Sequence, residues 1–335
     1  MAGVDKVVIC GVKRAGEPIP VGEIQQSIGR AGRFSGKPGE AVVLCEPDDA
    51  AYAEQCLNSL PPIVKSRLSG VDTVAFHVLP WLDRVRDEES YASWRSRTLA
   101  GLQGCQMPSW GEISGYLKRL GFMDAYGDAT EMGRISISTY YPPSRLHRLR
   151  SRLGEVGETD RFDPFEMSYL FGALVDSAGY LPEWEREQYE DYAGSLHSRG
   201  YRCDGNNDMR CFMAYSVVSC QPVRSLRHAL AQLRNDFGRL SMAARRVAED
   251  AGCVQAAKWI EIGGLMAVKR VPFEIASVMQ AFGGLSRQSA CELYDMGIEN
   301  FEDLVMSTDM VMDNGSDELR KELEKKDLLM RKEDE

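Results

Sequence analysis

The sequence predicts a multidomain, mainly α-helical protein with an α/β start. Two short β-branched runs, residues 4–10 and 40–44, flank a helical stretch within the first fifty residues. From about residue 50 the sequence turns helical. A chain of 335 residues is long enough for several domains with their own cores.

The balance of charge predicts no particular class of partner. There are 50 acidic and 40 basic residues, for a formal net charge of −10. Proteins that bind nucleic acids usually present a basic surface. A local basic stripe can nevertheless bind phosphates on an acidic protein.

The cysteine, histidine and apolar patterns argue against several classes of protein. The nine cysteines include no CxxC pair, and the four histidines form no HxxxH or HExxH pattern. We therefore expect reduced thiols, no disulfide framework and no metal site. No run reaches the roughly 18 apolar residues of a membrane span, and the N-terminus lacks a signal-peptide pattern. A cytoplasmic protein with no membrane partner is expected.

The first fifty residues are predicted to form strand, helix and strand. The strands are expected over 4–10 and 40–44, and the helix over 22–29, after a turn-rich stretch. Two strands cannot bury both faces of a parallel sheet. We therefore expect this segment to be the end of a larger α/β domain.

The middle of the chain is predicted to be helical with one β element. A helix over 110–123 is followed by a polar turn and a short β element over 130–141. A linker is predicted over 151–160, and helices from Asp163 to Pro272. One of these is expected to begin at Asp236. Its apolar stripe would comprise Phe237, Leu240, Ala244 and Val247.

The last sixty residues are predicted to form a compact set of short helices. Residues 278–304 indicate a helix, a tight Gly-Gly turn, a second helix that stops at Gly297, and a third helix. The tail from Ser316 is a charge-dense helix, which we expect to be a solvated face.

One motif carries recognisable chemistry. Residues 25–33 read QQSIGRAGR, with two arginines three residues apart. A guanidinium stays charged and donates several hydrogen bonds, so it suits the negative charge that builds up during nucleotide hydrolysis. An arginine in that role contributes a factor of roughly 10³–10⁵ in rate. Glycines between the arginines allow a facing domain to approach closely.

Residues 26–33, QSIGRAGR, resemble motif VI (QxxGRAGR) of superfamily-two helicases, in the form typical of the Ski-two-like branch. The chain most resembles the archaeal DNA-repair helicases of that branch. There, motif VI lies on the second RecA-like domain and faces ATP held by the first. The resemblance implies that Arg30 and Arg33 are arginine fingers and that Gln26 contacts the phosphates or couples the domains. It also implies that Gly29 and Gly32 belong to the nucleotide-binding segment.

Other nucleotide-binding motifs are missing from the sequence. There is no GxxxxGK[ST] loop, and Gly36-Lys37-Pro38 lacks the hydroxyl that such a loop offers to Mg²⁺. Asp87-Glu88-Glu89-Ser90 follows charged residues, so it is expected to be a helix surface. The resemblance therefore implies the C-terminal half of a helicase. An N-terminal half, in the same chain or a separate one, would bind most of the ATP and Mg²⁺.

The resemblance also implies nucleic-acid contacts before the helical bundle. A hairpin over Val12–Val21, with Lys13 and Arg14 at its turn, occupies the position of a duplex-parting hairpin, although an ordinary surface turn would look the same. Residues 61–68 and 130–141 resemble the lead-in and the ending of a winged helix. That domain could contact DNA through Lys118 and Arg119 or serve as a packing hinge.

In the archaeal repair helicases, a long ratchet helix contacts single-stranded DNA with an arginine and, two turns later, a tryptophan. Arg239 matches the arginine, but Arg246 stands in the place of the tryptophan. Two turns separate them by roughly 10.5 Å on one face. A guanidinium can stack on a base or bind phosphate, and Arg245 is a further candidate. The alternative is a solvated basic face paired with Glu249 and Asp250.

Residues 278–296 resemble a helix-hairpin-helix. Its hairpin offers backbone N–H groups at a helix N-terminus to a phosphate. The implied contacts are Gly284, Ser286 and Arg287, with Ser286 in place of the usual second glycine. The alternative is a domain that only braces the ratchet helix.

The resemblance divides the chain into four parts. These are the end of the second RecA-like domain (1–50), a connector and winged helix (51–150), the ratchet bundle (151–275), and the helix-hairpin-helix with the charged C-terminal helix (276–335). The implied function is part of an ATP-dependent DNA helicase that acts on single-stranded or forked DNA. Two alternatives stay open: a freestanding, non-enzymatic single-strand binder or adaptor, and part of an RNA-processing helicase. The intact Gln26, Arg30 and Arg33 favour the helicase.

Overall fold

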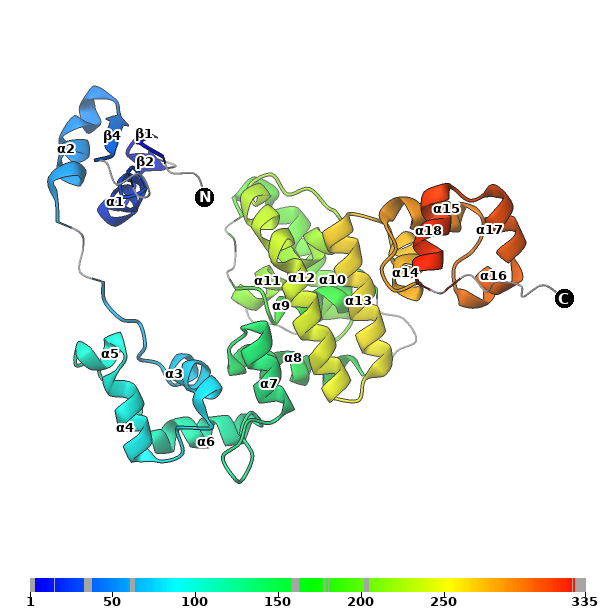
Figure 1. The fold of residues 1–335 in the computed structure, drawn as a ribbon, viewed down its shortest axis with the longest axis horizontal. Helices are drawn as coiled ribbons and strands as arrows, with labels where there is room; N and C mark the ends of the chain where they lie inside the picture. Colours follow the sequence, from blue (N-terminus) through cyan, green and yellow to red (C-terminus); the bar gives the residue numbers. More distant parts are fainter. Residues whose placement is uncertain are drawn as a thin grey trace. The chain divides into compact units, whose positions relative to one another are not determined.

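The computed structural model is mainly α-helical with a small β start, as the sequence predicts (Figure 1). It describes residues 4–14, 16–32, 38–60, 64–157, 163–176, 179, 181–201, 205–326 and 328. The chain forms two compact units, Met1–Ser66 and Arg67–Glu335.

The first unit contains a two-stranded parallel sheet, a small hairpin and two helices. Strands β1 (Lys6–Cys10) and β4 (Glu40–Leu44) pair in parallel, with Val8 opposite Val42. The antiparallel hairpin comprises β2 (Lys13–Arg14) and β3 (Glu17–Pro18). The helical elements are α1 (Val21–Ile28), the 3₁₀ turn η1 (Pro47–Asp49) and α2 (Ala50–Asn58). The predicted strands and the predicted helix are thus confirmed.

The core of the first unit is small. It comprises Val12, Ile24, Ala53 and Cys56. Val8 and Leu44 on the two paired strands remain 50% and 56% exposed. Helix α2 packs on this unit, since the Tyr52 hydroxyl donates a hydrogen bond to the Ile19 carbonyl at 2.7 Å. The first unit therefore extends past the boundary expected at residue 50.

The second unit begins with a set of short helices. They are α3 (Val71–Val78), the 3₁₀ turn η2 (Leu79–Trp81), α4 (Glu88–Ser96), α5 (Leu99–Leu102), α6 (Trp110–Leu120) and α7 (Glu131–Thr139). Asp87 starts α4 in a capping box with Ser90, as expected of a helix surface. Hydrogen bonds from the Ser90 hydroxyl and N–H lower the pKa of Asp87. Gly121 ends α6 in the left-handed conformation, with φ +81°.

The β element predicted over 130–141 is wrong. Residues 131–139 form α7, and the Thr130 hydroxyl caps it by accepting the Gly133 N–H at 3.2 Å. Met132 and Ile135 are buried at helical spacing. Gly133 permits close packing, because a Cβ there would lie 2.5 Å from the Phe122 carbonyl oxygen. Within the described residues, β pairing near α7 is limited to an antiparallel bridge between Met123 and Ala129.

A bundle of longer helices follows. Its elements are α8 (Pro143–Val156), α9 (Pro164–Gly172), η3 (Glu183–Glu185), α10 (Arg186–Ser198), α11 (Gly205–Val218), α12 (Arg227–Asp250) and α13 (Val254–Lys269). Helices α12 and α13 lie side by side (Figure 1). The linker predicted over 151–160 is wrong as far as residue 156, because α8 continues to Val156 with Leu153 and Val156 buried. Residues 158–160 lie outside the described residues.

Helix α12 begins at Arg227, nine residues before the predicted start at Asp236. Its predicted apolar stripe is confirmed, and Leu230 and Leu233 extend it toward the N-terminus. The mostly buried Glu185 carboxylate accepts hydrogen bonds from the N–H groups of Arg224 (2.8 Å) and Ser225 (3.0 Å) just before the helix. Burial alone would raise the pKa of Glu185, but these hydrogen bonds outweigh it and lower the pKa.

The described part of the chain after α13 contains five short helices. They are α14 (Phe273–Ala281), α15 (Arg287–Asp295), α16 (Phe301–Met306), α17 (Thr308–Asn314) and α18 (Asp317–Lys325). The predicted order of helix, Gly-Gly turn, helix, stop and helix is confirmed. The prediction that the tail helix is only a solvated face is wrong, because Leu319 and Leu323 of α18 are fully buried. These two leucines recur at a spacing of four and give α18 an apolar face.

Candidate functional site

The predicted nucleotide-binding segment starts in α1 and continues into the turn after it. Gln25 faces the rest of the unit, since its side-chain amide donates hydrogen bonds to the Ser59 and Cys56 carbonyls of α2 and its C-cap. Gln26 and Arg30, one helical turn apart, are both exposed. Neither side chain forms a hydrogen bond or an ion pair with the part of the chain that the structure describes. This surface is therefore able to receive an external anion.

The glycines of the segment have different backbone roles. Gly29 ends α1 with an ordinary φ of −66°. Gly32 has φ +71°, a conformation that favours glycine, and its N–H donates to the Val4 carbonyl at 2.7 Å. This bond ties the segment to Val4, two residues before β1. Arg33 lies outside the described residues.

Gly39 is a supporting residue that the motif does not include. A Cβ at this position would lie 2.3 Å from the Ala31 carbonyl carbon and 2.5 Å from the Gly32 nitrogen. Only a residue without a side chain lets the chain pass so close to the segment before it enters β4. The contact spans eight residues and belongs to no motif spacing, so nothing in the sequence pattern marks it.

The hairpin cations are both paired on the surface of the first unit. Lys13 pairs with Asp49 at 2.6 Å and Arg14 with Glu23 at 2.5 Å. The hydrogen bond to Asp49 raises the pKa of Lys13. The predicted position at the turn is wrong, since both residues form β2 and Gly16, with φ +87°, lies in the turn. Exposed pairs of this kind are weak and are screened by salt, so a phosphate can displace them.

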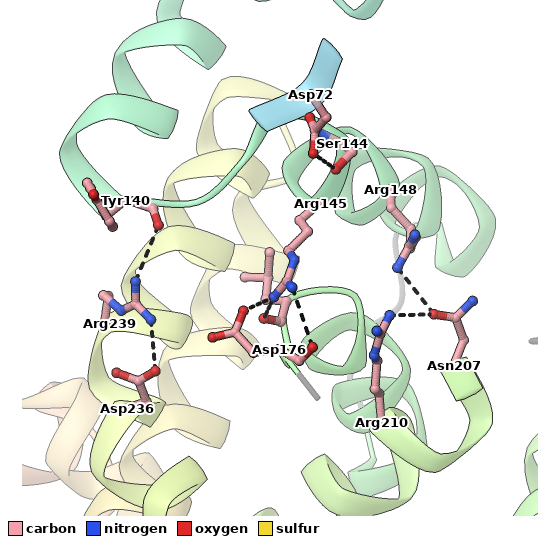
Figure 2. Close-up of polar contacts among 11 residues, drawn as sticks. Asp72, Tyr140, Ser144, Arg145, Arg148, Asp176, Asn207, Arg210, Asp236 and Arg239 are labelled. Atoms are coloured by element: carbon pink, nitrogen blue, oxygen red, sulfur yellow. Dashed lines mark hydrogen bonds and ion pairs between the residues drawn. The ribbon is translucent and has the colours of Figure 1, made fainter. Parts of the chain in front are cut away.

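Arg239 connects α12 with the segment after α7. Its guanidinium donates to the Tyr140 carbonyl at 3.3 Å and pairs with Asp236 at 2.8 Å (Figure 2). It also lies 4.6 Å from the centroid of the Tyr141 ring. Burial raises the pKa of Tyr141 to about 12. The Arg239 side chain keeps 32% of its surface exposed.

Arg246 connects α12 with α7 itself. It donates to the Ser138 hydroxyl at 2.5 Å and pairs with Glu131 at 3.1 Å. Arg245 pairs with Glu249 at 3.3 Å, the partner expected of a solvated basic face. Asp250, the other expected partner, instead pairs with Arg150 of α8 at 2.8 Å. Arg239 and Arg246 thus brace α12 against α7 and the segment after it. Sequence spacing alone did not indicate Glu131 or Ser138.

The backbone N–H group that the Gly-Gly hairpin would offer to a phosphate already binds a carboxylate of the protein itself. Gly283 and Gly284 have φ +66° and +89°, and Ser286 caps α15. The Ser286 N–H donates to the Glu322 carboxylate of α18 at 3.0 Å. In the opposite direction, the Ser316 N–H before α18 donates to Glu292 of α15 at 2.5 Å. Each of the two helices therefore supplies a carboxylate to the N-terminus of the other.

Side chains around this hairpin differ in their accessibility. Arg287 is exposed beside the hairpin, whereas the Ser286 hydroxyl accepts the Ser289 N–H at 3.2 Å. Lys326 adds a hydrogen bond to the Gly283 carbonyl at 2.7 Å. A phosphate that used the Ser286 N–H would have to displace Glu322.

Hydrogen exchange at the Ser286 backbone amide tests whether Glu322 protects the hairpin. Burial alone would raise the pKa of Glu322, but the hydrogen bonds from Ser286 and Ser289 outweigh it and lower the pKa. Its stabilising contribution is therefore full above the unfolded carboxyl pKa of about 4.3 and is lost as the pH falls through the lower folded value. Glu322→Gln is expected to speed hydrogen exchange at residues 283–290 by roughly tenfold at neutral pH, the equivalent of a net hydrogen bond of about 1.5 kcal/mol. Mass spectrometry of deuterated peptides measures this.

The matched control for that experiment is Glu318→Gln. Glu318 lies one turn earlier on α18 and is exposed. The Glu318→Gln variant makes the same change of charge, but Glu318 does not contact Ser286. Hydrogen exchange at residues 283–290 should therefore stay at the wild-type rate. Equal acceleration by both variants would contradict a specific role for Glu322.

Comparisons with known proteins add no relative. No protein-family model matches the sequence, and no curated protein matches it. Among the described residues, no helix is both long and apolar enough to cross a membrane. The same residues contain no group of three or more His, Cys, Asp or Glu side chains placed to hold a metal ion.

Proposed function

We propose that this chain is the C-terminal portion of an ATP-dependent DNA helicase of the Ski-two-like branch of superfamily two. The observation that carries the proposal is the accessibility of Gln26 in α1 and of Arg30 in the turn after it, neither of which has a carboxylate partner among the described residues. An arginine that only stabilised its own unit would be paired locally. An exposed guanidinium suits a triphosphate held by another domain.

In this proposal, Arg30 and Arg33 stabilise the charge that develops on the transferring phosphoryl group. Gln26 contacts the same phosphates or couples the two RecA-like domains. Gly29, Gly32 and Gly39 shape the backbone behind these side chains. The segment fits one side of an ATP site, and the phosphates and Mg²⁺ would be held mainly by an N-terminal half. Bound ATP supplies the bond whose hydrolysis drives strand movement.

The proposal assigns the parts of the chain to helicase domains. The first unit, Met1–Ser66, is the end of a second RecA-like domain, which accounts for the half-exposed Val8 and Leu44 on a sheet of two strands. A connector and a winged helix built on α3, α6 and α7 follow it, as far as residue 150. Residues 151–275 are the ratchet bundle, with α12 as its long helix. Residues 276–335 are the helix-hairpin-helix and C-terminal helix.

Single-stranded DNA would contact the second unit without reading its sequence. Arg239 and Arg246 keep about a third of their surfaces exposed, but they are engaged with Asp236 and Glu131. A DNA strand that binds Arg239 and Arg246 would replace their carboxylate partners with its phosphates. Arg245, at 41% exposure, and Arg287 extend the same chemistry. Such binding weakens steeply as salt rises.

The test is reconstitution of the ATPase. A polypeptide that carries the P-loop and DExH box of this branch would be combined with the chain, and ATP hydrolysis measured with and without single-stranded DNA. We expect hydrolysis stimulated by DNA only when both parts are present. If the two parts associate and bind DNA but the chain adds nothing to ATP hydrolysis, the result favours the adaptor instead.

A further inference from the structure

A cavity in the second unit lies apart from α12 and the Gly-Gly hairpin. It is bounded by η2 and the segment through α4, and its volume of about 440 Å³ falls within the range of small-molecule sites. The side chains that matter for its chemistry are Trp81, Trp94, Arg84, Arg97, Ser90 and Ser93. All are supplied by one stretch of 17 residues within a single unit.

The two tryptophans give the cavity aromatic walls that are held in place. The Trp94 ring stacks on the fully buried Tyr91 ring, with centroids 5.8 Å apart and planes at 21°. The Tyr91 hydroxyl donates to the Pro108 carbonyl at 2.9 Å. Trp81 belongs to η2 between the buried Leu79 and Leu82, and it remains 44% exposed. The Trp81 indole is therefore accessible to a ligand, whereas the Tyr91 ring that supports Trp94 is buried.

The charges around the cavity are positive. Arg84 and Arg97 line it, and its lining includes no acidic residue among the described residues. Arg84 lies 5.8 Å from the Trp81 ring centroid, and its ion pair among the described residues is a long contact of 3.5 Å with the exposed Asp83. Arg97 donates to the Ser93 hydroxyl at 3.0 Å, which orients it without neutralising it.

Two of the nearby acids are engaged elsewhere, whereas Asp83 lies against Arg84. Asp87 is used in the capping box of α4, and Glu88 accepts the Trp110 N–H at 3.0 Å. Arg84 and Arg97 therefore give the lining of the cavity a positive charge that suits an anion.

Aromatic faces beside guanidinium groups recognise a planar ring that carries a phosphate. A base stacks on tryptophan whatever its identity, and an adjacent phosphate accepts hydrogen bonds from arginine. An acidic peptide would satisfy the arginines but would leave the indole faces without a stacking partner. We propose that this cavity binds a nucleotide, with its base against Trp81 and Trp94 and its phosphate against Arg84 and Arg97.

The nucleotide has two possible sources, a single strand of DNA and a free mononucleotide. The inference rests on the proposed function only if the nucleotide belongs to a strand of DNA. In that case the cavity is a further contact with the strand, in addition to α12 and the Gly-Gly hairpin.

The experiment uses the full chain and a fluorescein-labelled oligothymidylate, with binding followed by fluorescence anisotropy at low salt. Trp81→Ala and Arg97→Ala are each expected to raise the Kd by roughly tenfold or more, the effect of losing one stacked base or one phosphate contact. Trp81→Phe, which retains a ring, should recover most of the affinity. Trp184→Ala is the control, because Trp184 is 70% exposed and does not line the cavity.

Competitors identify the ligand. If thymidine monophosphate displaces the oligonucleotide only at far higher concentration than unlabelled strand, the source is the strand. If it competes equally well, the cavity takes a free mononucleotide, and the nucleotide proposal still stands. Displacement by an acidic peptide as readily as by nucleotides would overturn it. Wild-type affinity in both Trp81→Ala and Arg97→Ala would also overturn it.

These outcomes are separable from the helicase proposal. Failure of the cavity variants to change binding leaves the ATPase reconstitution untouched. Conversely, a chain that adds nothing to ATP hydrolysis can still lose nucleotide affinity when Trp81 is replaced.

Discussion

In the reconstituted two-part enzyme, Arg30→Ala is expected to lower the rate of DNA-stimulated ATP hydrolysis by roughly 10³–10⁵-fold. The side chain is exposed at the end of α1 and has no local partner among the described residues, so its loss should cost the first unit little stability. The loss would fall on the step in which negative charge builds up on the phosphoryl oxygens. Steady-state ATPase assays at saturating DNA would measure it.

Lys6→Ala is the matched control for Arg30→Ala. Lys6 is an exposed cation in the same unit, but it is paired with Glu40 on the neighbouring strand. Its removal changes the net charge identically, so the ATPase rate should stay within a few-fold of wild type. A second comparison, Arg30→Lys, separates charge from hydrogen-bonding geometry, because lysine lacks the planar fork. If Arg30→Ala hydrolysed ATP as fast as Lys6→Ala, the assignment of Arg30 as an arginine finger would be refuted.

Gly172→Ala is expected to destabilise the helical bundle by about 1–3 kcal/mol, as overpacked cores do. Gly172 ends α9 where that helix packs on α11. A Cβ there would lie 2.4 Å from the Cys211 sulfur and 2.8 Å from the Cys211 Cα. Because one of these neighbours is backbone, α11 has to shift as a whole. Urea denaturation followed by circular dichroism would measure the change in the free energy of unfolding.

Gly194→Ala provides the opposite expectation in the same bundle. Gly194 lies within α10, and a Cβ there would meet no atom within 4 Å. Alanine in a helix interior is favoured over glycine by roughly 0.5–1 kcal/mol, so this variant should be slightly more stable than wild type. Destabilisation of equal size by both substitutions would show that close packing at Gly172 is not the cause.

The sequence predicted the class of fold well because most of its elements are marked by local signals. The β-branched runs, the helix periodicity and the Gly-Gly turn each occupy a few neighbouring residues. The failure over 130–141 has a physical reason. The alternation in Ile135-Ser136-Ile137-Ser138 imitates a strand, whereas the Thr130 cap and burial against Phe122 select a helix. Tertiary contact decided between two patterns that are locally compatible.

The site could be predicted less completely than the fold. The motif indicated Gln26 and Arg30, and both are accessible as that interpretation requires. The partners Tyr140 of Arg239, Glu131 of Arg246 and Glu322 of Ser286 lie 36 to 115 positions away, so no spacing rule could have found them. Gly39 was missed for the same reason, since its role depends on a crossing of two segments.

The bracing of α12 by internal carboxylates has a consequence for thermodynamic measurements. A strand that takes Arg239 sets Asp236 free to gather cations from solution, which offsets cations released from the phosphates. Glu131 loses Arg246 but keeps its pair with Arg134. The slope of log affinity against log salt concentration should therefore be smaller than the number of arginines in contact with phosphates predicts. The carboxylates of the protein thus act as counterions of these arginines before DNA binds, so binding replaces existing ion pairs and does not add new ones.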